Sequence, residues 1–221
     1  MILIEKSRQP NWLTEHQRRG GTFEGLSGTT STGVNRKQDL RELLVKDQHG
    51  LCAYCTQRIR PTPGEMKIEH YYPQALIATA GKGLSDRRYT AYKNLLGCCY
   101  GGQALGKPNF HCDNDRPERE LTLDPQREAH IIQLRYNFAD GTIKSDNPTL
   151  ADNLNVDLRL NVRYLKIERK RRLLAFQKQL REYGGSKRVP KSYYERALSD
   201  TPKPHEGIRR AYIQKKLNSL A

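Results

Sequence analysis

The sequence predicts an α+β fold in which cysteines bind a metal ion and thereby fasten two loops together. Three observations lead to this expectation: all cysteines lie between residues 52 and 112, a strand-like stretch separates them, and helical periodicity with positive charge dominates the C-terminal third. We expect an N-terminal arm (1–34), a metal-stapled core (35–125), a β-hairpin (126–150) and a basic, mainly helical C-terminal region (151–221).

The charge of the chain is positive and unevenly distributed. Its 221 residues contain 39 Lys and Arg against 24 Asp and Glu, a net charge of +15. Residues 151–221 hold 18 of these cations and 7 of the anions, a net charge of +11, which leaves +4 for residues 1–150. This imbalance favours a polyanionic partner such as nucleic acid over a merely solvated helix face.

No part of the sequence has the pattern of a membrane or export signal. No apolar stretch approaches the ~20 residues of a membrane span, and Glu5 interrupts the short apolar start. We therefore expect a cytoplasmic protein with no membrane partner.

The five cysteines have the spacing of a metal site. Their odd number and the missing secretory signal argue against a disulfide framework. Cys52 and Cys55 are separated by two residues, the spacing of a zinc knuckle. A redox pair with this spacing would need a βαβ context, whereas this pair follows a helical pattern over residues 36–48.

Cys99 and Cys112 are the expected second half of a tetrahedral site. The glycine-rich loop between them can fold outward and return both sulfurs to one ion. Adjacent residues rarely ligate the same ion, so Cys98 is expected to be spare, and His111 is an alternative ligand beside Cys112. Four thiolates would close the coordination sphere and make the zinc structural; five ordinary buried cysteines are the remaining alternative.

A strand is expected over residues 67–71, between the two halves of the zinc site. Ile68 follows a Pro- and Gly-rich turn, and Pro73 ends the strand. Glu69 and His70 therefore stand at a strand end beside a loop. Asn94 precedes Cys99 by five residues and is held in place by that cysteine.

The order of these motifs resembles the zinc-stapled HNH endonuclease family. The motifs are CxYC (52–55), IEHxxP (68–73), YxNLLxxC (92–99) and HCD (111–113). The chain is similar in particular to the HNH subunit of Septu-type anti-phage defence systems, some of which accompany retrons. The likeness is close over 36–116 and looser as far as residue 155. It implies a ββα-metal core, in which a two-stranded hairpin packs on a helix and holds a catalytic Mg²⁺ or Mn²⁺.

The resemblance also implies a role for each matching residue. His70 would be the general base, because a neutral imidazole accepts a proton near pH 7. Glu69 would help to hold the ion, and Asn94 would either ligate it or hydrogen-bond the loop that orients His70. Asp113 stands where the family usually has His or Asn; a carboxylate suits a hard cation. His111 and Asn114 are neighbours that could serve instead.

The implied function is metal-dependent hydrolysis of phosphodiester bonds, with DNA as the default substrate. Structured RNA such as tRNA is an alternative substrate, and a non-catalytic zinc module that binds nucleic acid is an alternative function. The resemblance to Septu systems implies an SMC/ABC-like ATPase as partner. Because some of these systems accompany retrons, a reverse transcriptase and its nucleic acid are further candidate partners. In such a complex the C-terminal helices could contact the partner instead of nucleic acid.

Local patterns predict the flanking segments. Gly and Thr in the N-terminal arm favour a loop that Trp12 anchors to the core. Alternation over 131–145 with a turn at Asp140-Gly141 predicts the hairpin. A helical pattern begins at Leu154 and carries a cationic run over 168–172, which we expect to face phosphates.

Overall fold

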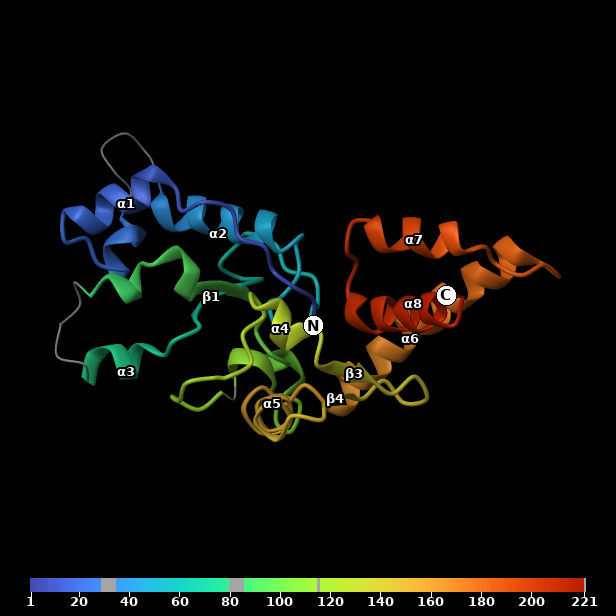
Figure 1. The fold of residues 1–221 in the computed structure, drawn as a ribbon. Coiled ribbons are helices and arrows are strands. Elements are labelled where there is room, and N and C mark those ends of the chain that lie inside the picture. Colours follow the sequence, from blue (N-terminus) through green and yellow to red (C-terminus); the bar gives the residue numbers. More distant parts are fainter. Residues whose placement is uncertain (29–34, 80–85, 115, 221) are drawn as a thin grey trace.

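The computed structural model describes residues 1–28, 35–79, 86–114 and 116–220 as a mixed α+β chain that is mostly helical (Figure 1). Its strands form two antiparallel sheets of two strands each within the described residues. One end of the elongated molecule holds the N-terminal helices and the first sheet, and the other end holds the last helices (Figure 1). The α-helices are α1 (Asn11–Arg18), α2 (Arg36–Asp47), α3 (Gln74–Thr79), α4 (Glu128–Ile131), α5 (Pro148–Asp152), α6 (Arg163–Gly184), α7 (Lys191–Ser199) and α8 (Glu206–Asn218).

The first sheet pairs β1 (Lys67–His70) with β2 (Leu95–Cys98), and α2 packs against it. Register places His70 opposite Leu95. The Gln48 side chain, just after α2, ties the helix to β2, since it accepts from Gly97 N (2.7 Å) and donates to Gly97 O (2.8 Å). The predicted strand is confirmed, except that Tyr71 lies just beyond its end.

The segment after Cys112 differs from the helix that the HNH resemblance implies there. Only a single 3₁₀ turn (Cys112–Asn114) is present among the residues described between 112 and 120. Pro117 follows it and disfavours helical backbone at the preceding residue. The helix packed on the first sheet is α2, which precedes the strands in the sequence.

The N-terminal arm is more ordered than expected. It contains α1 and a 3₁₀ turn (Glu24–Ser27), because Leu13 and Leu26 are fully buried in the core. Trp12 packs against this core as expected, and the guanidinium of Arg36 lies 5.1 Å from its ring centre. The Thr-rich stretch over 29–33 lies outside the described residues.

The second sheet is a shorter hairpin than expected. It pairs β3 (Leu134–Tyr136) with β4 (Ile143–Ser145), and Ile131 belongs to α4 instead of a strand. Gly141 has φ +80°, and a Cβ there would lie 2.2 Å from the carbonyl oxygen of Lys166. Only glycine fits this turn, because α6 approaches it so closely.

The long C-terminal helix starts later than predicted. Residues 148–157 form α5 and a π-helical turn (Asn153–Asp157), and α6 begins at Arg163. Buried side chains of α6, α7 and α8 form a second hydrophobic cluster of Phe176, Leu180, Tyr194, Ala197 and Ile213. None of the described helices is long and apolar enough to cross a membrane.

Two cations of the 168–172 run do not face solvent, which corrects the prediction for that run. Arg169 is 3% exposed and donates to the carbonyl oxygens of Gly141 and Leu160, both at 2.6 Å. Arg172 donates to buried Glu206 at 3.0 Å. These buried acceptors need donors, so the two guanidinium groups join α6 to its neighbours.

Candidate metal centre and catalytic cavity

Four buried thiols meet at one point and could hold a metal such as zinc. The sulfurs of Cys52, Cys55, Cys99 and Cys112 all lie within 4.8 Å of one another. Neighbouring sulfur pairs are 3.6 to 3.9 Å apart. A tetrahedral zinc with Zn–S bonds of ~2.3 Å places its sulfurs about 3.8 Å apart, so the thiols fit this ion.

Backbone hydrogen bonds bring the two halves of this group together. Ala53 N donates to Gly97 O at 3.0 Å, which joins the first pair of cysteines to β2. Gln57 N points at the Cys55 sulfur and Gly101 N at the Cys99 sulfur, each at 3.4 Å. Such amide donors stabilise thiolates, as expected for a metal knuckle.

The buried position of the four thiols affects their charge. Burial raises the pKa of Cys55 and Cys112 well above the usual thiol value. The pKa of Cys52 falls well below it, because hydrogen bonds from the other thiols outweigh burial. Four buried thiolates would require a positive ion for compensation.

Cys98 and His111 lie outside the group of four. Cys98 is fully buried at the end of β2, and its sulfur is not part of the group of four. His111 Nδ1 lies 3.2 Å from the Cys112 sulfur, which is within hydrogen-bonding distance. His111 is thus placed to hydrogen-bond the Cys112 sulfur, and the group of four contains Cys112 and not His111.

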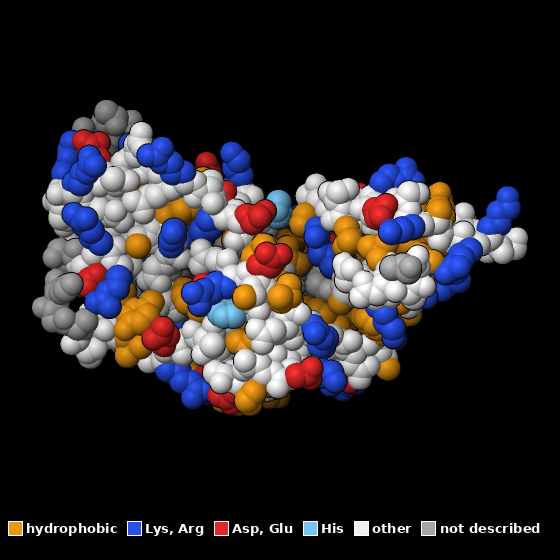
Figure 2. Space-filling view, in the orientation of Figure 1, with side chains coloured by type: hydrophobic (Ala, Val, Ile, Leu, Met, Phe, Trp, Pro, Cys, Tyr) orange, Lys and Arg blue, Asp and Glu red, His pale blue; other side chains and the backbone are white. Residues whose placement is uncertain are grey.

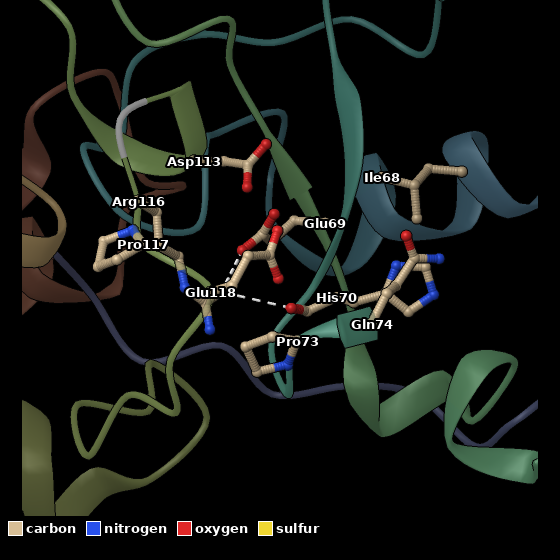
Figure 3. A pocket seen from close by; sticks show the side chains of 9 residues that line it. All are labelled: Ile68, Glu69, His70, Pro73, Gln74, Asp113, Arg116, Pro117 and Glu118. Atoms are coloured by element: carbon tan, nitrogen blue, oxygen red, sulfur yellow. Dashed lines mark hydrogen bonds and ion pairs between the residues drawn. The ribbon is translucent and has the colours of Figure 1, made fainter. Parts of the chain in front are cut away.

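A cavity of about 230 Å³ lies at the end of β1 (Figure 3). Three of the predicted catalytic residues line it: Glu69, His70 and Asp113. Its remaining lining residues are Ile68, Pro73, Gln74, Arg116, Pro117 and Glu118. Figure 3 shows Glu69 and Asp113 on one side and the His70 ring on the other, as expected for successive residues of a strand.

The two carboxyl groups of the cavity shift each other's pKa. Burial, and secondly a hydrogen bond with Asp113, raise the pKa of Glu69 well above its usual value. Burial alone would raise the pKa of Asp113, but the hydrogen bond from Glu69 and the ammonium of Lys67, 3.2 Å away, lower it. The pKa values of the two carboxyl groups thus shift in opposite directions, and a divalent cation held by both carboxylates would compensate their negative charge.

His70 is held in the tautomer that a base needs. Its Nε2 lies 2.9 Å from the carbonyl oxygen of Tyr89. A carbonyl only accepts, so Nε2 carries the hydrogen and Nδ1 keeps its lone pair. Burial lowers the pKa of His70 and keeps the ring neutral, and Phe23 packs edge-on against it with ring centres 4.6 Å apart.

Asn94 does not line the cavity. Of its two predicted roles, ion ligand or support of the loop that orients His70, its contacts match the second. Its Oδ1 accepts from Tyr72 N at 2.6 Å, and its Nδ2 donates to Tyr72 O at 3.3 Å and Arg88 O at 2.9 Å. The loop after His70 is thereby joined to the segment that presents the Tyr89 carbonyl.

Sequence reasoning missed Arg116. Its side chain is 4% exposed, forms an ion pair with Glu69, and donates to the carbonyl oxygens of His70 (3.3 Å) and Tyr71 (2.6 Å). Its place four residues after Cys112 was the only signal, and nothing else separated it from the other cations of the chain.

Neither the family models nor the curated proteins include a match to this chain.

Proposed function

We propose that this protein is a metal-dependent endonuclease of the HNH type that hydrolyses phosphodiester bonds in DNA. The observation that carries the proposal is a single cavity lined by His70, Glu69 and Asp113, with His70 Nε2 held by the Tyr89 carbonyl oxygen and Asp113 directly following one of the four clustered cysteines. The HNH resemblance of the sequence motifs supplies the reaction class.

The four cysteines have a structural role in this proposal. A Cys₄ site has no open position for substrate, so zinc would fasten residues 52–55 to residues 99–112. Asp113 directly follows the ligand Cys112 and reaches the cavity through it. Loss of zinc would separate Asp113 from Glu69.

The carboxyl groups and His70 divide the chemistry. Mg²⁺ or Mn²⁺ held by Glu69 and Asp113 would stabilise negative charge on the phosphate in the transition state. His70 Nδ1 takes a proton from the attacking water, whose oxygen forms the new bond to phosphorus. The ester P–O bond breaks, and its oxygen leaves with a proton from solvent.

The Arg116–Glu69 ion pair favours a second candidate, a zinc module that binds nucleic acid without cleaving it. A buried carboxylate with an arginine partner can serve structure alone. This candidate has no use for a base held in one tautomer beside a carboxyl pair, so we rank it second.

The HNH resemblance further suggests an effector of anti-phage defence that works with an SMC/ABC-like ATPase, and structured RNA as the alternative substrate. The test incubates the chain, with and without the product of its genomic neighbour, on supercoiled plasmid, labelled DNA and total RNA. Divalent metal should support cleavage and EDTA should stop it. Retained binding with no cleavage in any arm would replace the nuclease with the binding module.

A further inference from the structure

Residues 181–193 comprise the end of α6, the turn after it and the start of α7, and they project at the end of the molecule opposite α1 and α3 (Figure 1). We call these residues the α6–α7 tip. Lys and Arg side chains are prominent at this end in the space-filling view (Figure 2). The cavity is lined by residues 68–74 and 113–118, so the charge of the tip has no part in the lining of the cavity.

The tip has a strong excess of positive charge. It contains Arg181, Lys187, Arg188 and Lys191 against the single acid Glu182, a net charge of +3. Glu182 pairs with Lys178 and Lys191 with Glu195, both between exposed side chains. The other three cations have no acidic partner within 4 Å among the described residues, and all of them are exposed.

The tip also presents an aromatic ring to solvent. Tyr183 is 52% exposed, although it packs against Tyr193 with ring centres 4.2 Å apart. Tyr193 in turn contacts buried Tyr194, which belongs to the second hydrophobic cluster. The exposed ring of Tyr183 is therefore held in place, through Tyr193, by the second hydrophobic cluster.

The backbone fixes the turn between the two tyrosines. Gly185 N donates to Arg181 O at 2.9 Å, and Lys187 N donates to Gly184 O at 2.8 Å. Val189 packs against the second hydrophobic cluster. The cations and the ring thus belong to one folded element.

We propose that the α6–α7 tip binds single-stranded nucleic acid. Arg181, Lys187 and Arg188 contact consecutive phosphates, and Tyr183 stacks on an unpaired base. Charge alone would also suit an acidic protein, but the exposed, supported ring matches the flat face of a base. The inference rests on the proposed function for its choice of polyanion, and it adds a substrate anchor remote from the cleaved bond.

The test measures fluorescence anisotropy of a labelled 20-nucleotide strand with the full chain at several salt concentrations. The tip variant Arg181→Gln/Lys187→Gln/Arg188→Gln should bind about tenfold more weakly or worse, with a salt slope smaller by about 2. Tyr183→Ala should lose about 5- to 100-fold in affinity, and Tyr183→Phe should retain it. The matched control, Arg163→Gln/Arg196→Gln/Lys203→Gln, removes the same charge from exposed positions outside the tip.

Equal losses for the tip variant and the control would overturn the inference. The inference would also be overturned if the chain bound an acidic protein but not the labelled strand. It would likewise be overturned if the chain bound duplex more tightly than single strand and Tyr183→Ala left the affinity unchanged. Hydrolysis of bis(p-nitrophenyl) phosphate tests the nuclease separately and should be unchanged in all tip variants. If the chain binds the strand through the tip but hydrolyses neither this ester nor nucleic acid, only the nuclease proposal is contradicted.

Discussion

Arg116 donates a hydrogen bond to Oε1 of Glu69, and both side chains are almost fully buried. The same guanidinium reaches the carbonyl oxygens of His70 and Tyr71, so one residue holds the end of β1 and one carboxyl group of the cavity. The lining of the cavity thus depends on a residue outside the recognised motifs.

Removal of Arg116 should destabilise the fold strongly. Arg116→Gln leaves Glu69 buried without its charged partner and should cost about 3–5 kcal/mol in the free energy of unfolding. Glu69→Gln added to it should restore part of that loss. Urea denaturation of the two single variants and the double variant measures the coupling. Arg60→Gln, at an exposed pair with Glu65, is the control and should change stability by less than about 1 kcal/mol.

The zinc prediction distinguishes Cys52, one of the four clustered cysteines, from Cys98, which lies outside the cluster. Cys52→Ser should lose most of the bound zinc and several kcal/mol of stability, roughly 10 °C in Tm for a chain of this size. Cys98→Ser changes a buried thiol outside the group and should keep one zinc per chain. Elemental analysis and thermal melts with and without chelator give both values. Zinc loss from Cys98→Ser alone would mean that the ligand assignment is wrong.

His70→Ala should reduce cleavage by at least about 100-fold, because the variant has no base for the attacking water. Zinc content and the far-ultraviolet circular dichroism spectrum should stay as in the wild type. His130→Ala is the matched control, since His130 lies outside the cavity and accepts from Asp124 N. Full activity of His70→Ala would refute the assignment of the base.

Substitutions at Asn94 and at Asp113 should change different properties of the cleavage reaction. Asn94→Ala frees the loop after His70 and should lower the cleavage rate about 10- to 100-fold at an unchanged requirement for Mg²⁺. Asp113→Asn removes a charged oxygen and should raise the Mg²⁺ concentration needed for half-maximal rate. Rate measurements over a metal titration distinguish these outcomes. A shifted metal requirement in Asn94→Ala would instead assign Asn94 as a ligand.

Lys6 should make stability depend on pH. Burial lowers the pKa of Lys6 from 10.5 to about 7, and a neutral amine can still donate to the carbonyl oxygens of Tyr92 and Leu95. The unfolded chain therefore binds more protons between about pH 7 and 10.5, and stability should rise with pH over that window. In Lys6→Met this contribution, of order a few kcal/mol, should be absent. Denaturation series at pH 7 and 9.5 for both proteins measure the difference; parallel changes would contradict the shift.

Local patterns predicted the elements that depend on nearby residues. The helix over 36–47 and the strand at 67–70 follow from periodicity and from the backbone preferences of glycine and proline. The N-terminal helix α1 was missed, because its helix-forming signal is weak and the burial of Leu13 in the core stabilises it. The start of α6 was misplaced for a related reason, since residues 148–157 form their turns against the second sheet.

The sequence by itself predicted the four thiols as a metal group from their spacing, with His111 left as an alternative ligand, and the structure brings the four sulfurs together. It also singled out Glu69, His70 and Asp113 as candidates. Only the tertiary structure decided that Asn94 holds a loop, that Arg116 pairs with Glu69, and that Arg169 is buried. Each of these roles depends on which distant backbone carbonyl or carboxylate the folded chain brings to a side chain, and sequence spacing carries no record of that position.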